Sequence, residues 1–169
     1  MTPTPLVALD PPDRRAWLVV NDVVMGGRSL GAMDVTRASV VFTGELNTNG
    51  GGFASIRSQG LLADLSRFTA VVLRIAGDGR EWTCDFRAAA SSRGFSVTWK
   101  ATFATSADST TVVRLPFSAF RPTWRGQLVP DSRIPPAEVF PAAMKSVGFT
   151  IADRRDGAFR IEVLGVDGV

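Results

Sequence analysis

Five carboxylates between residues 22 and 85 could supply an acid and a base for hydrolysis. They are Asp22, Glu45, Asp64, Asp78 and Asp85. Glycosidases work with such a pair, one group protonated and the other ionised, on either side of the scissile bond. The sequence context favours structural roles, because Asp64 precedes Leu65-Ser66 as a turn or cap residue does and Asp78 stands between glycines. Asp85 falls on the polar face of an expected strand, so a carboxylate-dependent hydrolase ranks third among the functions considered.

Other catalytic chemistry is limited by the residue types that the chain lacks. There is no histidine and no tyrosine, and Cys84 is the only cysteine. Ser-His-Asp catalysis, Cys-His catalysis, and the usual histidine or cysteine metal sites therefore have no residues from which to form. No glycine-rich segment fits a dinucleotide-binding or P-loop fingerprint. We expect a protein that is not an enzyme, with no catalytic residues, no metal site and no cofactor.

The segment from Trp17 to Ser29 is unusual in composition and reads W-L-V-V-N-D-V-V-M-G-G-R-S. Its two glycines allow the backbone to turn sharply or to lie close to a ligand or another chain. One interpretation makes Asp22 a structural corner that bonds to loop amides. The other makes Asp22 and its polar neighbours the lining of a ligand or metal pocket, because loops on a rigid sandwich often carry binding sites.

A second segment, Thr48 to Arg57, reads T-N-G-G-G-F-A-S-I-R and opens with an Asn-Gly hairpin signal. Arg57 either forms an ion pair with an aspartate such as Asp22 or Asp78, or binds a phosphate. Trp82 and Trp124 present a similar choice. Each is either partly buried or placed at a loop rim, where it could stack on a sugar or anchor a protein partner.

The elements that must position these residues are strands, because apolar and polar residues alternate through most of the chain. The clearest run is 95–103, in which Phe95, Val97 and Trp99 fall on one face. Further strands are expected within residues 17–20, 39–46, 71–75, 83–88, 113–117, 147–151 and 159–163. Tight turns are expected at 49–52, 77–79, 91–94 and 156–157. This pattern predicts an all-β sandwich or barrel, with at most one or two short helical turns near 137–144.

One domain accounts for the length, with residues 1–15 as an extended N-terminal arm and residues 16–169 as a single sandwich. The net charge is only +3 and the arginines are scattered, so we expect no nucleic-acid binding. The beginning of the chain resembles neither a signal nor a transit peptide, and no segment approaches the roughly 18 apolar residues of a membrane span. These features predict a cytoplasmic bacterial protein.

A series of short motifs covers the chain from Trp17 almost to its end. They are W-x-x-V-N-D-x-V-M-G-G-x-S at 17–29, F-x-G-x-L at 42–46, N-G-G-G-F-A-S-I-R at 49–57, D-L-S at 64–66, R-x-x-G-D-G-R at 74–80, P-F-x-x-F at 116–120, R-G at 125–126, S-V-G-F at 146–149 and G-x-F-R-I-E-V at 157–163. Their order and spacing resemble the complex I intermediate-associated protein 30 family. That family usually has an aromatic such as tyrosine where Trp82 stands.

The resemblance implies a galactose-binding-domain-like jelly roll and kinship with a factor that assists assembly of respiratory complex I. The leading expectation is a non-enzymatic binding or assembly module with a protein partner, such as a respiratory-complex subunit; the alternative ligand is a saccharide. The residues expected to bind are Asn21, Asp22, Met25, Gly26, Gly27, Ser29, Asn49, Gly52, Arg57, Asp78, Gly79, Arg80, Trp82, Trp124 and Arg125. We expect their loops to converge at one end of the sandwich.

Overall fold

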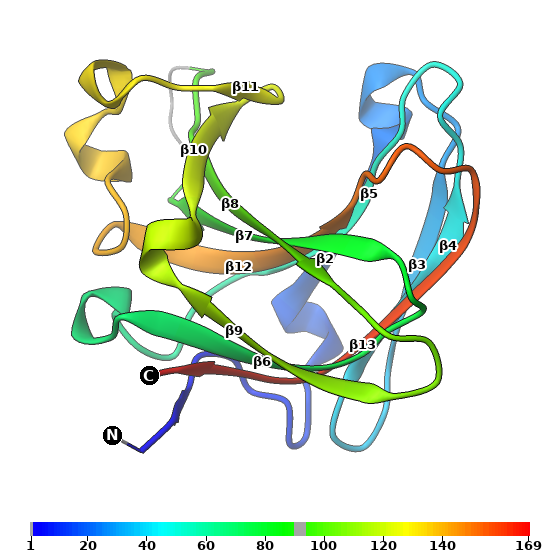
Figure 1. The fold of residues 1–169 in the computed structure, drawn as a ribbon, viewed down its shortest axis with the longest axis horizontal. Helices are drawn as coiled ribbons and strands as arrows, with labels where there is room; N and C mark the ends of the chain where they lie inside the picture. Colours follow the sequence, from blue (N-terminus) through cyan, green and yellow to red (C-terminus); the bar gives the residue numbers. More distant parts are fainter. Residues whose placement is uncertain (1, 90–93) are drawn as a thin grey trace.

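The computed structural model describes residues 2–89 and 94–169. Two antiparallel sheets pack face to face (Figure 1), with β6, β9 and β13 in the lower layer and β7, β8 and β12 in the upper layer. The six-stranded sheet contains β1 (Thr4–Pro5), β3 (Leu30–Val35), β4 (Val40–Leu46), β6 (Ala70–Ala76), β9 (Thr110–Pro116) and β13 (Gly157–Gly168). The seven-stranded sheet contains β2 (Trp17–Asn21), β5 (Ala54–Ser58), β7 (Glu81–Ala88), β8 (Thr98–Ala104), β10 (Arg121–Trp124), β11 (Gln127–Leu128) and β12 (Met144–Ile151).

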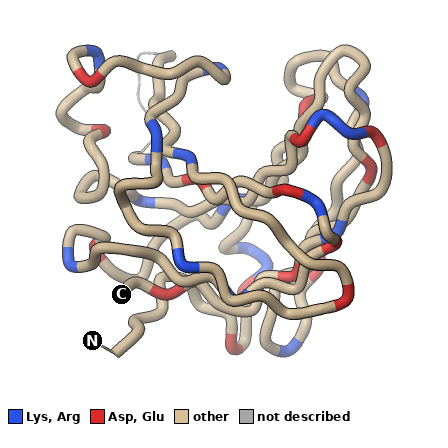
Figure 2. The backbone as a smooth tube through the Cα atoms, in the orientation of Figure 1, with Lys and Arg blue, Asp and Glu red and all other residues tan. Residues whose placement is uncertain are grey.

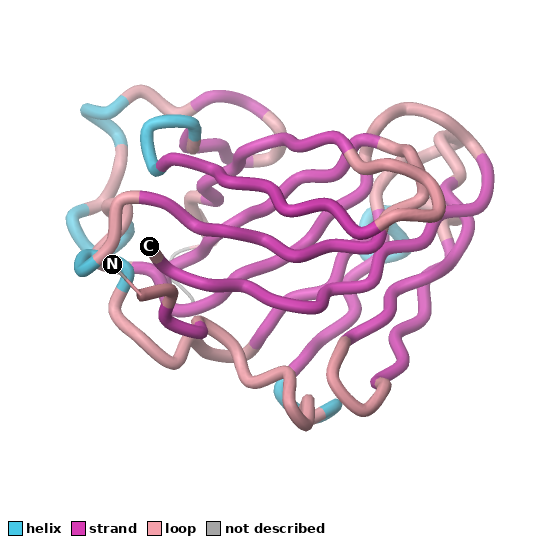
Figure 3. Tube along the Cα trace, turned by 60° about the horizontal axis from the view of Figure 1, so that its bottom comes forward, coloured by secondary structure: helices cyan, strands magenta, loops and turns pink. Residues whose placement is uncertain are grey.

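The expected β-sandwich is therefore confirmed. Short helical turns are more numerous than the one or two expected, because many loops close with a single 3-10 turn. The described residues contain η1 (Arg14–Ala16), η2 (Asp22–Met25), η3 (Leu65–Arg67), η4 (Phe117–Ala119), η5 (Asp131–Arg133) and η6 (Pro136–Glu138). Figure 3 shows short helical turns in the connections between strands. The expected turn at 91–94 lies mostly outside the described residues.

Strand order in the seven-stranded sheet is β11-β10-β8-β7-β12-β5-β2, which differs from the order along the chain. Late strand β12 is inserted between β7 and β5, and β13 is likewise inserted between β4 and β6 in the other sheet. The edge strands β2 and β3, one from each sheet, contact each other on the same side of the sandwich. Residues far apart in sequence are therefore neighbours on both outer faces.

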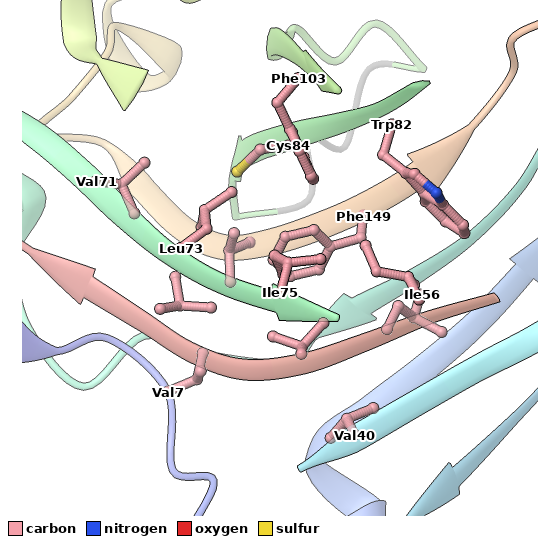
Figure 4. Packing of buried hydrophobic residues seen from close by; sticks show 14 of the residues in the cluster. Val7, Val40, Ile56, Val71, Leu73, Ile75, Trp82, Cys84, Phe103 and Phe149 are labelled. Atoms are coloured by element: carbon pink, nitrogen blue, oxygen red, sulfur yellow. The ribbon is translucent and has the colours of Figure 1, made fainter. Parts of the chain in front are cut away.

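The core lies between the two sheets, and it is formed by the apolar residues of the alternating strand pattern, which face inward (Figure 4). Leu73 and Ile75 of β6 are fully buried, as are Cys84 of β7 and Phe149 of β12. The N-terminal residues pack onto the sandwich, because β1 pairs with β13 and Leu6 is fully buried. The strand expected over 95–103 begins only at Thr98.

Candidate functional site

The carboxylate of Asp22 is fully buried and holds two loops together. It accepts hydrogen bonds from the backbone nitrogen and the hydroxyl of Ser29, at 2.9 Å and 2.7 Å, and from the backbone nitrogens of Gly52 and Phe53, at 2.7 Å and 3.2 Å. Burial raises the pKa of Asp22, but these hydrogen bonds outweigh it and keep the pKa below its ordinary value near 3.8. Asp22 is therefore the structural corner of the Trp17–Ser29 segment, with both oxygens engaged.

Two glycines make this corner possible by letting backbone approach the carboxylate. A Cβ atom on Gly27 would lie 2.3 Å from the Asp22 Cγ, and one on Gly51 would lie 2.5 Å from its Oδ2. Gly26 ends η2 with a φ of 84°, in the left-handed region that favours glycine. Asn21 adds a bond from its Nδ2 to the Gly31 carbonyl. Asn21, Gly26, Gly27, Ser29 and Gly52 thus take part in the corner, and the Asn21 Oδ1 is buried without a hydrogen-bond partner among the described residues.

The Asp78–Arg80 turn is held by a second set of structural bonds, made by Arg80, which we call the Arg80 staple. Arg80 is 6% exposed and makes a two-pronged ion pair with Asp153, at 2.9 Å and 2.6 Å, while its Nη1 donates to the carbonyls of Gly157 and Ala158. Hydrogen bonding to Asp153 raises the pKa of Arg80 above its ordinary value. The staple joins the β6–β7 turn, where Gly79 has a φ of 84°, to the β12–β13 turn.

Asp78 and Trp82 are also committed to the fold. The Asp78 carboxylate accepts from the backbone nitrogens of Arg80 and Arg160 and from the indole nitrogen of Trp82. The Trp82 ring is fully buried and packs edge-on against Phe42 and Phe159. The expectation that Trp82 contacts a ligand or partner at a loop rim is wrong, because its side chain belongs to the core.

The expected convergence of the loops is partial. Asp156 lies in the β12–β13 turn that Arg80 binds, and it connects this turn to the 47–53 loop of the Asp22 corner. Its Oδ1 accepts from the backbone nitrogen of Thr48, next to Asn49, at 2.7 Å. The corner, the 47–53 loop and the Asp78–Arg80 turn therefore meet at one end of the sandwich. In the β12–β13 turn of this end, Asp153 and Asp156 flank Arg154 and Arg155 in sequence, and Figure 2 shows basic and acidic residues next to each other in this region.

Arg57, Trp124 and Arg125 lie away from that end. Arg57 lies on the outer face of β5, and no ion pair joins it to Asp22 or Asp78 within the described chain. Trp124 and Arg125 form the β10–β11 turn, with the Arg125 guanidinium 4.9 Å from the Trp124 ring centre. Trp124 is partly buried and also packs against Phe95.

One expected binding residue is strongly exposed together with other apolar side chains. Met25 of η2 is 69% exposed, and the neighbouring Val24 is 73% exposed. We define the apolar edge by six exposed residues on β2, η2 and the start of β3: Leu18, Val19, Val23, Val24, Met25 and Leu30. Both flanking strands are sheet edges, so the outward side of this segment has no neighbouring strand. Gatherings of exposed apolar side chains mark interaction sites.

A second feature lies on the outer face of the seven-stranded sheet and was missed from the sequence. Strand pairing places Arg57, Gly148, Asp85 and Lys100 side by side in one row across β5, β12, β7 and β8. Arg87 lies two residues beyond Asp85 on β7 and shares this face. We call Arg57, Arg87 and Lys100, with Asp85 between them, the cationic cluster.

Several polar atoms of the cationic cluster have no hydrogen-bond partner among residues 2–89 and 94–169. Asp85 is 2% exposed, and its Oδ2 accepts from the Thr150 hydroxyl at 2.8 Å, but its Oδ1 is buried without a hydrogen bond. The Nε atoms of Arg57 and Arg87 are also buried and unbonded. Burial lowers the pKa of Arg87, and repulsion from Arg57 adds to this, against a smaller opposing attraction to Asp85. The alternation of 55–57, 83–87 and 98–102 indicated the shared face, but not which strands are neighbours.

The acidic residues considered for hydrolysis occupy structural positions. Asp64 caps η3 by accepting from the Ser66 backbone nitrogen, which confirms its predicted role. Glu45 is exposed on β4, in the other sheet from Asp85. Within residues 2–89 and 94–169, no three His, Cys, Asp or Glu side chains gather as a metal site would require. No helix in that part of the chain is long and apolar enough to cross a membrane.

Solved structures with this architecture include modules that bind carbohydrates. A family 11 carbohydrate-binding module from Clostridium thermocellum, in complex with a β-1,3-1,4-mixed-linked tetrasaccharide, is 15% identical with a TM-score of 0.63, covering 98% of this chain and 97% of that chain. A CBM28 module described as specific for non-crystalline cellulose is 10% identical with a TM-score of 0.55, covering 98% and 93%. At such low identity the likeness concerns the fold alone.

The family model for complex I intermediate-associated protein 30 matches residues 8–163. This range includes the Asp22 corner, the Arg80 staple, the apolar edge and the cationic cluster. Several of the residues in the motifs that gave the sequence its resemblance, among them Asp22, Ser29, Gly52 and Arg80, brace the loops at one end of the sandwich. The chain belongs to the complex I intermediate-associated protein 30 family.

Proposed function

We propose that this chain is a non-catalytic binding module that holds another protein against its apolar edge. The observation that carries the proposal is the exposure of six large apolar side chains on three consecutive segments. Removing such side chains from water on binding contributes roughly 25 cal/mol for each Å² of apolar surface. A protein surface can cover an edge of this kind, whereas a saccharide offers few apolar groups to it.

The corner beneath the apolar edge supports the same function. Val23, Val24 and Met25 project from η2, whose first residue is the fully bonded Asp22. A loop that is already held in one conformation loses little entropy when a partner binds. The bonds around Asp22 therefore hold η2 in one conformation before a partner binds.

The family name suggests the class of partner. Because the family is named for association with complex I intermediates, we propose a subunit or assembly intermediate of a respiratory complex as the protein that is held. The available residues favour holding over catalysis, since the carboxylates Asp22 and Asp78 are engaged within the fold.

A capture experiment with matched variants tests the proposal. Tagged wild type, Val24→Asp and Val112→Asp would be cross-linked in the native host, and the captured proteins identified by mass spectrometry. Val112 is 67% exposed on β9, outside the apolar edge, so it controls for a new surface charge. We expect wild type and Val112→Asp to enrich the same respiratory subunit and Val24→Asp to lose it. Equal enrichment by all three would overturn the proposal.

Saccharide binding is the second candidate, favoured by the likeness to carbohydrate-binding modules and by the hydroxyl-rich outer face of the seven-stranded sheet. That face presents Thr83, Thr102, Thr123 and Thr150. Its strand positions in the described residues carry no aromatic ring on which a neutral sugar could stack. Calorimetric titration with a mixed-linked β-glucan tests this candidate; heat that is lost in Thr150→Val but not in Val24→Asp would favour the saccharide over a protein partner.

A further inference from the structure

We propose that the cationic cluster receives an acidic segment of the protein partner, with an Asp or Glu carboxylate bound between Arg57 and Arg87. The inference rests on the proposed function, because it assigns the part of the partner that lies beside the apolar edge. Of the four cluster residues Arg57, Asp85, Arg87 and Lys100, the sequence motifs contained only Arg57.

The first argument is the balance of charge in the cluster. Three cations surround one carboxylate, and the ion pairs of the described residues involve none of the three: they are Arg14–Asp34, Arg80–Asp153 and Arg160–Glu162. Arg57 and Arg87 repel each other across β12. A carboxylate placed between two guanidinium groups would replace this repulsion with two charge-assisted interactions.

The second argument is the set of buried atoms without partners. Arg57 Nε on β5 and Arg87 Nε on β7 are donors without an acceptor among the described residues, on either side of β12. Buried polar groups are hydrogen-bonded in most proteins, and each one left unsatisfied is costly. Structural arginines in this chain are satisfied, as Arg80 shows with its bonds to Asp153. Within the described residues, Arg57 and Arg87 therefore lack the acceptor that Asp153 supplies to Arg80.

The third argument is the space between the arginines. Gly148 of β12 stands between Arg57 and Asp85 in the row, and a Cβ atom there would lie 2.7 Å from the Asp85 Oδ1. The glycine lets Asp85 lie over β12 and leaves no side chain of that strand between it and Arg57. Between Arg57 and Asp85 the row therefore carries no β12 side chain that would block an anion.

The position of the row indicates a peptide as the source of the anion. On the next strand, β2, the row continues with Leu18, which pairs with Arg57. Leu18 belongs to the apolar edge. A protein that covers the apolar edge therefore meets the cationic cluster on the adjoining strand. Charge complementarity then requires acidic side chains in that part of the partner.

Nuclear magnetic resonance on the ¹⁵N-labelled chain tests the inference directly. The side-chain Nε–Hε signals of Arg57 and Arg87 would be assigned from Arg57→Gln and Arg87→Gln and then followed during titration with a hexaglutamate peptide. We expect both signals to shift with hexaglutamate and not with hexaglutamine. We also expect the affinity to fall by about tenfold or more in either variant, as for the loss of a charged hydrogen bond. Arg114→Gln, on exposed β9, serves as the matched control and should bind normally.

Three outcomes would overturn the inference. They are Arg57 and Arg87 signals that do not move with hexaglutamate, affinity that is unchanged in both variants, and equal or stronger shifts with trigalacturonate, which would identify an acidic saccharide. The apolar edge is tested separately, because Val24→Asp should leave hexaglutamate binding intact. Loss of capture by Val24→Asp with no hexaglutamate binding would overturn only the acidic-segment inference. Hexaglutamate binding with unchanged capture would overturn only the proposed function.

Discussion

Asp22 binds Ser29 twice, once through the backbone nitrogen at 2.9 Å and once through the hydroxyl at 2.7 Å, across the glycine pair that separates η2 from β3. The same carboxylate accepts from Gly52 and Phe53, so a single side chain joins two loops that are thirty residues apart in sequence. This relationship makes Asp22 a stability determinant, whichever ligand the module binds.

Asp22→Asn should therefore destabilise the fold. The amide keeps one acceptor oxygen, but its NH₂ group faces backbone donors and leaves them unsatisfied, at a cost of about 2–3 kcal/mol in the free energy of unfolding. Urea unfolding at neutral pH measures the loss. Glu45→Gln, at an exposed position on β4, is the control and should change stability by less than about 0.5 kcal/mol. A neutral effect of Asp22→Asn would contradict the role of Asp22 as a corner.

The same corner predicts how stability depends on pH. Burial raises the pKa of Asp22, but hydrogen bonds from Ser29, Gly52 and Phe53 outweigh it, so the folded pKa lies below the ordinary value near 3.8. A lowered folded pKa contributes stability that is fully present above the unfolded pKa and is lost as pH falls through the folded pKa. Unfolding free energies measured from about pH 6 down to about pH 3 should show the wild type and Asp22→Asn curves converging in acid. A gap that stays constant over this range would refute the prediction.

The Arg80–Asp153 pair should behave as a coupled unit. Both side chains are nearly buried, at 7% and 6% exposure, so removing one partner leaves the other charge buried alone. We expect Arg80→Met to cost about 3–5 kcal/mol and the double variant Arg80→Met, Asp153→Leu to cost less than the sum of the two single changes. Thermal unfolding of the wild type, of Arg80→Met, of Asp153→Leu and of the double variant gives the coupling energy. Additive losses would show that Arg80 acts mainly through the Gly157 and Ala158 carbonyls.

Much of the fold was predictable because strand periodicity depends on local sequence. Leu73 and Ile75 on the inner face of β6 follow directly from alternation, and Asp64 caps η3 as its position before Leu65-Ser66 indicated. The burial of Trp82 could also be predicted from the alternation. Trp82 shares the parity of Cys84 and Phe86 on β7, which places its ring in the core rather than at a rim.

The cationic cluster could not be predicted in the same way. Alternation gives the face on which Arg57, Asp85 and Lys100 lie, but the proximity of Arg57 to Asp85 depends on the insertion of β12 between β5 and β7. That pairing is set by the tertiary fold and joins strands far apart in sequence. The exposure of the apolar edge has a similar origin, because Leu18 and Val19 look like core residues until β2 is known to be an edge strand.

Arg87→Gln should affect stability and binding in opposite directions. Burial and repulsion from Arg57 disfavour the charged Arg87 side chain in the fold, so a neutral residue removes an unfavourable interaction. We expect a free energy of unfolding that is unchanged or higher by up to about 1 kcal/mol, as is common when a binding residue is replaced. Thermal unfolding at low and high salt measures the effect, which should shrink with salt because added ions screen the repulsion that the variant removes. Arg114→Gln on β9 should show no gain. A clear loss of stability in Arg87→Gln would mean that Arg87 serves the fold through Asp85, and it would remove the energetic argument for the cationic cluster as a binding site.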